Sequence, residues 1–184
     1  MVDAAIYMEN RRSVALAELL ASGREPEVRD LVYILALGAA VQEDKEERHR
    51  TVMRFLTALY PNYREIFESA IGTKYNRTYQ RCLSLIRDLV SDIPVDILNT
   101  RLLFLSLTMM HLFSAREAAL EARPSARAYW AGPRIIANMV DAYTGMLLAP
   151  VQPAALAVAE ATLSPEAATS GRRSGSGKKS AMRL

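Results

Sequence analysis

Residues 102–113 read LLFLSLTMMHLF, and none of them is Asp, Glu, Lys or Arg. A helix that is apolar on nearly all of its faces must be covered on nearly all of them. The run is too short to span a bilayer, which needs about 20 apolar residues, and Arg101 and Arg116 flank it. The pattern therefore predicts the central helix of a soluble helical bundle.

A second long helix is expected over residues 134–148, after an elbow marked by Ala122–Ser125 and Gly132–Pro133. Its apolar residues recur at helical spacing: Ile135, Ile136, Met139, Val140, Tyr143 and Leu147. The next ridge carries small side chains every four residues: Ala137, Asp141, Gly145 and Ala149. Gly inside a helix costs about 1 kcal/mol relative to Ala. The ridge therefore predicts a close helix–helix contact, either within the chain or with a second copy of it.

The rest of residues 1–150 also repeats apolar side chains at intervals of three and four, which predicts an all-α antiparallel bundle of about seven helices. Further helices are expected over residues 3–21, 26–42, 52–60, 63–71 and 74–91. Arg11 and Arg12 of the first helix are expected in solvent. Residues 151–184 begin Ala- and Pro-rich, with a marginal helix at 154–163, and end as a basic Ser/Gly-rich tail expected to be disordered.

Charge is distributed unevenly. Residues 1–149 hold 18 basic and 18 acidic side chains, so the formal net charge of +3 belongs to the tail. A neutral body is a poor nucleic-acid surface, because that affinity rests on clustered positive charge. A single cysteine, Cys82, and the lack of a signal-like N-terminus indicate a cytoplasmic protein without membrane attachment.

The strongest enzymatic hint is Glu46-x-x-His49, the spacing that a helix offers to a di-iron site. A second such pair is missing, since Thr108 stands three residues before the other histidine, His111. His111 itself is expected to be a core or pocket residue. We therefore predict no enzyme, no catalytic residue, no metal and no cofactor. A helical-bundle metal-dependent enzyme is kept as an alternative.

Aromatic and methionine side chains lie on helices that should meet inside the bundle. Methionine adapts to irregular shapes and tyrosine brings a polar tip to an apolar wall, as small-molecule pockets require. The pattern equally fits a plain core, so a ligand-free helical interaction protein is a further alternative. The candidate ligand-binding residues are Met53, Tyr75, Tyr79, Cys82, Met109, Met110 and Phe113.

Four segments together carry a family resemblance. They are Glu9–Arg12, the run AELLASG at 17–23, the run AREA at 115–118, and the closing run ANMVDAYTGMLLAP at 137–150. In this order they resemble the C-terminal ligand-binding and dimerisation domain of TetR-type transcriptional repressors, over about residues 3–150.

The resemblance implies a homodimer in which the last two long helices pair with their mates as a four-helix bundle, and a cage of helices around a small apolar or amphipathic inducer. Tyr79, Cys82, Met109 and Phe113 are then pocket candidates. The interface candidates, with two residues of the small-residue ridge, are Ile135, Met139, Asp141, Ala142, Tyr143, Gly145 and Met146.

In this family an N-terminal helix-turn-helix domain reads DNA. The present sequence starts where that domain should already have ended. We therefore expect DNA binding only in a form that carries the missing head, and none by this chain alone.

Overall fold

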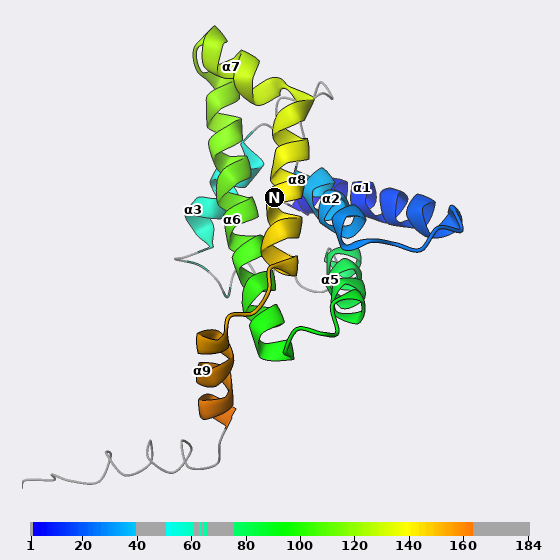
Figure 1. Cartoon of the computed structure of the whole chain (residues 1–184). Helices are drawn as coiled ribbons and strands as arrows, with labels where there is room; N and C mark the ends of the chain where they lie inside the picture. The colour runs from blue at the N-terminus through cyan, green and yellow to red at the C-terminus, as the bar shows by residue number, and fades with distance from the viewer. Residues whose placement is uncertain (1, 40–50, 61–62, 64, 66–75, 164–184) are drawn as a thin grey trace, which may run out of the picture. The chain divides into compact units, whose positions relative to one another are not determined.

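The computed structural model describes residues 2–39, 51–60, 63, 65 and 76–163 (Figure 1). Every regular element in these ranges is an α-helix, which confirms the predicted all-α class. Most of the helix expected at 63–71 lies outside the described residues. The chain divides into two compact units, residues 1–149 and 150–184, and each is described by itself.

α1 (Val2–Ala21) and α2 (Val28–Ala39) are joined by a tight turn. The Ser22 hydroxyl donates back to the last turn of α1 at 2.7 Å. Gly23 follows at φ +71°, the left-handed conformation in which glycine commonly ends a helix. Asp30 then stabilises the start of α2, because its carboxylate accepts the backbone N–H of Glu27 at 2.8 Å and the guanidinium of Arg24 at 2.7 Å.

α2 is the helix that is buried on nearly all sides. It packs against α1, α5 (Arg77–Leu89) and α8 (Pro133–Leu148). Leu31, Val32, Leu35 and Ala36 are fully inaccessible to solvent, and Ile34 is nearly so. The first unit is therefore built around α2 as much as around the longer helix that the sequence placed at its centre.

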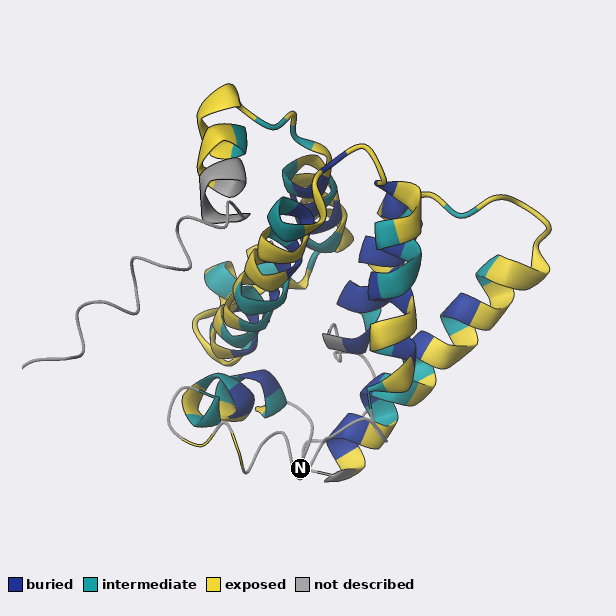
Figure 2. Cartoon of the chain, turned by 90° about the horizontal axis from the view of Figure 1, so that it is seen from below, coloured by how far each residue is buried: buried dark blue, intermediate teal, exposed yellow. Residues whose placement is uncertain are grey.

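α6 (Val95–Glu121) is that longer helix, and it contacts α3 (Val52–Leu59), α5 and α8. The prediction that it is covered on nearly all faces is wrong for the single chain, because Leu103 and Phe104 are each about half exposed. Its buried apolar residues, Leu98, Leu102, Leu105, Met109 and Phe113, follow one helical stripe. Apolar composition does not tell whether the cover of the other faces comes from the same chain. Figure 2 shows the helices with dark buried sides and yellow outer sides.

By length and composition alone, the whole of α6 is also apolar enough to cross a membrane, which the shorter run 102–113 was not. Two charged side chains, Arg116 and Glu117, are nevertheless buried in its last turns. The Arg116 Nε donates to the carbonyl of Trp130 at 3.0 Å. α6 is thus held by polar as well as apolar contacts within the unit.

The elbow between the two long helices contains a short helix of its own, α7 (Pro124–Ala131). Proline stands at the start of both α7 and α8, where its fixed φ and missing N–H are tolerated. At the other end of α8, Arg101 of α6 donates to the carbonyl of Leu147 at 2.8 Å. This bond satisfies one of the carbonyls that a helix C-terminus leaves without an intrahelical partner.

The second unit contains α9 (Pro153–Leu163), which coincides with the helix expected at 154–163. The basic tail, residues 164–184, lies outside the described residues, so its expected disorder stays a prediction.

Candidate functional site

A charged side chain lies within the apolar interior of the first unit. Arg12 of α1 is only 9% exposed. The buried positions of α1 follow one helical stripe through Ala5, Met8, Arg12 and Leu16. The expectation that Arg12 is solvated is therefore wrong, since its place in this register turns it towards the core.

The surroundings of Arg12 are shaped to hold a guanidinium. Its central carbon lies 5.3 Å from the centroid of the Tyr79 ring of α5, a cation–π arrangement. Gly38 of α2 lies on another side, and a Cβ built there would collide with the guanidinium atoms. Burial lowers the pKa of Arg12, opposed by Tyr79 and Glu9, but an arginine stays protonated.

Glu9 stands one helical turn before Arg12 on α1. One carboxylate oxygen accepts the backbone N–H of Thr78 at 2.6 Å, close to the start of α5. The other oxygen, Oε2, is buried and has no hydrogen-bond partner in the part of the chain that the structure describes. The Nε of Arg12 is also buried, and it has no hydrogen-bond partner among the described residues. A buried polar atom without a partner costs about 1–3 kcal/mol, so this pair of atoms needs an explanation.

The Tyr79 hydroxyl makes a short hydrogen bond with the hydroxyl of Ser106 on α6. Burial raises the pKa of Tyr79, so it is a neutral phenol at neutral pH. Cys82, one turn further along α5, is fully buried, and this burial raises the pKa of its thiol to about 11. An uncharged thiol of this kind is not a reactive nucleophile.

The predicted pocket residues lie on three helices. Met109 and Phe113 are buried on α6, and Met110 is half-buried beside them. Met53 is buried on α3, and Tyr75 lies outside the described residues. Tyr79 meets α6 at Ser106, whereas the backbone N–H of Met53 meets it at Glu117. These two points are about 16 Å apart along the helix, so the candidates line a length of α6 and do not converge on one spot.

Glu9, Arg12 and Ser106 were not among the site residues predicted from the sequence. The signal for Arg12 was its position in the apolar stripe of α1. Ser106 carried no signal, because its role depends on the long-range meeting of α5 and α6.

The predicted interface residues on α8 divide into two sets. Ile135, Met139 and Tyr143 are buried within the single chain, because the apolar stripe of α8 faces α2 and α6. Ala142 and Gly145 are exposed and Met146 is half-buried. A Cβ built on Gly145 would meet no atom of the described residues within 4 Å, so no close contact in that part of the chain explains this glycine.

Asp141 has a partner in its own chain. Its carboxylate accepts from the Nε of Arg29 on α2 at 2.8 Å, and both side chains are more than half exposed. Such a surface pair contributes about 0–1 kcal/mol, so it connects α2 to α8 without fixing their packing.

Next to the open side of α8, α6 presents an apolar outer side. Leu103 and Phe104 are half exposed, and Thr108, His111, Ala115 and Ala118 are exposed on the same helix. The expectation that His111 belongs to a core or pocket is wrong for the single chain. α6 and α8 contact each other, and each has an exposed side.

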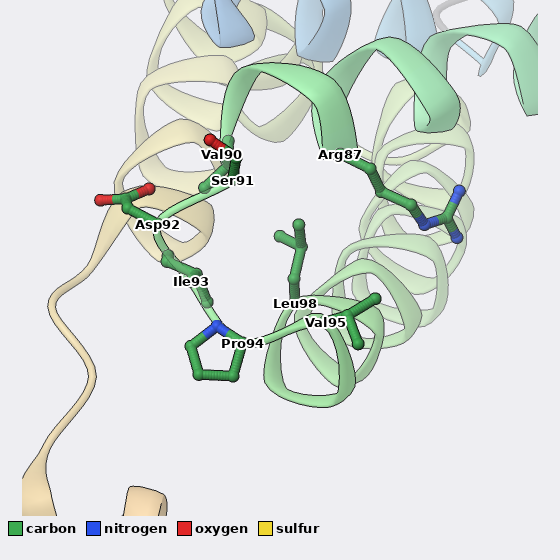
Figure 3. Close-up of a pocket in the computed structure, with 8 residues that line it drawn as sticks. All are labelled: Arg87, Val90, Ser91, Asp92, Ile93, Pro94, Val95 and Leu98. Atoms are coloured by element: carbon green, nitrogen blue, oxygen red, sulfur yellow. The ribbon is translucent and has the colours of Figure 1, made fainter.

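A surface hollow of about 350 Å³ lies at the corner between α5 and α6 (Figure 3). Its lining consists of Arg87, Val90, Ser91, Asp92, Ile93, Pro94, Val95 and Leu98. None of the predicted ligand residues is among them. At its rim, the Arg87 Nε donates to the Asn99 side chain at 3.0 Å. Glu46 and His49, the metal-binding hint, lie outside the described residues.

One family profile, described as "Tetracyclin repressor-like, C-terminal domain", matches residues 37–146. No curated protein matches the chain. No solved structure matches it either. The matched range contains α5 and α6 and most of α8, and therefore Tyr79, Ser106 and the exposed outer side of α6.

Proposed function

The chain belongs to the tetracyclin repressor-like C-terminal domain family, the regulatory part of TetR-type transcription regulators, and from this premise we propose that it senses a small amphipathic molecule in its interior and acts as a homodimer. Domains of this family generally bind small-molecule effectors and dimerise. The proposal concerns the kind of effector, the residues that bind it and the surface that dimerises.

The observation that carries the ligand proposal is the Glu9–Arg12–Tyr79 cluster. It places polar side chains from α1 and α5 near the buried Cys82, and Tyr79 meets α6 at Ser106, three residues before the buried Met109. Small-molecule sites combine such an apolar wall with a few convergent polar groups. An amphipathic ligand would place its polar end at Arg12 and Glu9 and its apolar body along α6, towards Phe113.

The dimer proposal uses the outer sides of α6 and α8. Two α6 and two α8 helices would form a four-helix bundle, with Leu103 and Phe104 buried against the partner copy. The bare Gly145 would let a partner helix approach closely. A cytoplasmic location follows from the work of a transcription regulator, and DNA reading is proposed only for a form that carries a helix-turn-helix head.

Thermal unfolding in the presence of aromatic and acyl compounds tests the ligand proposal. A compound at 100 times its dissociation constant stabilises the native state by about 2.7 kcal/mol, which corresponds to a rise in Tm of about 5–10 °C for a chain of this size. Arg12→Met should abolish the rise. The matched control Arg81→Met removes an exposed arginine from α5 and should preserve it. A library without any stabilising compound, or an amphipathic hit unaffected by Arg12→Met, would refute the proposed site.

A further inference from the structure

We infer that the polar end of the effector is electrically neutral and carries a hydrogen-bond donor next to an acceptor, as in a primary amide or a hydroxyl group, with Arg12 donating to the acceptor and Glu9 accepting from the donor. This inference rests on the proposed function and specifies the chemistry of the same site. It follows from the charges and the unused hydrogen-bonding atoms of the cluster.

The charges of the cluster already cancel. Glu9 and Arg12 are three residues apart on α1, so their side chains emerge on one face of the helix. In the described part of the chain, no ion pair joins the two side chains. They are nevertheless close enough that the charge of Glu9 raises the pKa of Arg12. A ligand with its own full charge would leave this buried group with a net charge, which is costly in a low-dielectric interior. A neutral ligand keeps the balance.

The hydrogen-bonding atoms left over are complementary. Glu9 Oε1 is used by the Thr78 N–H, and the Tyr79 hydroxyl is used by Ser106. Among the fully buried atoms of the cluster in the described part of the chain, the Nε of Arg12, which is a donor, and Oε2 of Glu9, which is an acceptor, have no hydrogen-bond partner. A ligand group that bridges these atoms must accept from the first and donate to the second. An amide or a hydroxyl can do both, whereas a carboxylate can only accept.

A series of four probes with a common body tests the inference: 4-butylbenzamide, 4-butylbenzoate, 4-butylacetophenone and butylbenzene. They differ only in the polar end, which is respectively a neutral donor and acceptor, an anion, a neutral acceptor, and absent. Dissociation constants are measured by calorimetry with the full chain. We expect the benzamide to bind at least about tenfold more tightly than each of the others, because each of them leaves a buried polar atom unpaired or adds a charge.

Two variants distinguish this pattern of affinities from a general preference for apolar ligands. Glu9→Gln removes the negative charge and leaves Arg12 uncompensated, so the preference should reverse in favour of the benzoate. Arg12→Met should weaken the benzamide about tenfold or more and leave butylbenzene unchanged. The matched control Glu18→Gln, at an exposed position of α1, should alter none of the affinities.

The outcomes that overturn the inference are distinct from failure of the proposed function. If the benzoate or butylbenzene binds the wild-type chain as tightly as the benzamide, the interior still takes a ligand but the neutral-bridge chemistry is wrong. If none of the four binds, the inference is also wrong, while the broader library described above decides the proposed function on its own.

Discussion

Gly38 is the residue on which the position of Arg12 depends most directly. A Cβ at this position would collide with the guanidinium, which is buried and has little room to move. Gly38→Ala gains about 1 kcal/mol of helix propensity but introduces overpacking that costs about 1–3 kcal/mol. We therefore expect a net loss in the free energy of unfolding, measured by urea denaturation.

A second background makes the cause of that loss testable. In an Arg12→Met chain the collision partner is replaced by a flexible side chain, so Gly38→Ala should then stabilise the protein. A double-mutant cycle gives the coupling directly. Equal effects of Gly38→Ala in both backgrounds would show that Arg12 does not occupy the space beside Gly38.

Cys82 provides a pH-dependent test of burial. Its thiol has a pKa of about 11 in the folded chain against 9.0 as the ordinary value. Below pH 9 the thiol is protonated in both states and its contribution is constant. Between pH 9 and pH 11 the unfolded chain releases the proton first, so stability falls, by about 3 kcal/mol in total for a shift of this size.

The comparison that isolates Cys82 is with Cys82→Ala, because other groups also titrate in this range. The difference in free energy of unfolding between wild type and variant should shrink as the pH rises from 8 to 11. Parallel pH profiles for the two proteins would mean that the thiol is not buried as described.

Whether a residue is buried was predicted better by its position in the helical repeat than by its residue type. Cys82, Met109 and Phe113 are apolar residues at core spacing, and they are buried. Arg12 is a charged residue at core spacing, and its charge led to the wrong prediction that it lies in solvent. Its burial requires the space at Gly38 and the ring of Tyr79, two partners that are remote in sequence.

At the scale of elements, the start of α3 depends on a side chain from another helix. Thr51, which precedes the helix, makes no capping bond. Instead, the buried carboxylate of Glu117 on α6 accepts the backbone N–H groups of Met53 and Arg54, each at 2.9 Å. Burial raises the pKa of Glu117, and these two bonds oppose the rise. α3 therefore gets its N-terminal cap from α6.

Glu117→Ala should accordingly destabilise the chain. The loss of a cap costs about 0.5–2 kcal/mol, and the space left by the side chain adds to it, so about 2–3 kcal/mol is expected in a urea titration. Glu121→Ala is the matched control, because it removes a carboxylate from the same helix that pairs with Arg54 at a partly exposed position. The control should change stability by about 0.5 kcal/mol at most. Similar losses from both variants would argue against the capping role.

The helices themselves were predictable because local chemistry marks their ends. α1 ends before Gly23 and α8 begins at Pro133, close to the predicted bounds at 21 and 134. The short α7 was missed, since it lies within a segment that reads as an elbow. The cap of α3 by Glu117 was beyond prediction, because the residues concerned are 64 positions apart.

At the scale of the whole molecule, α6 serves two environments. Its inner side meets Tyr79 through Ser106, and its outer side exposes Leu103 and Phe104. Sequence analysis could not divide the helix into these sides, because both are apolar. In the proposed dimer, a ligand at the inner side and a partner copy at the outer side contact the same rigid element. A ligand can shift the dimer geometry only as far as it binds one arrangement more tightly than another.

Gly145→Leu tests the outer surface. Among the described residues of one chain, nothing lies within 4 Å of a Cβ at this position, and the substitution replaces the glycine with a better helix former, so the protomer should fold and gain up to about 1 kcal/mol. In the proposed four-helix bundle, the same side chain would stand between two closely packed helices and weaken association. Sedimentation equilibrium should show a dimer for wild type and a larger fraction of monomer for the variant.

Ala17→Leu is the control, because it adds comparable bulk at an exposed position of α1, away from α6 and α8. It should leave the dimer intact. A second probe approaches from the neighbouring helix: Phe104→Glu puts a charge on the outer side of α6, where only a partner copy would bury it. If Gly145→Leu and Phe104→Glu both remain as dimeric as wild type, the copies associate through another surface, and the small-residue ridge of α8 has no role in assembly.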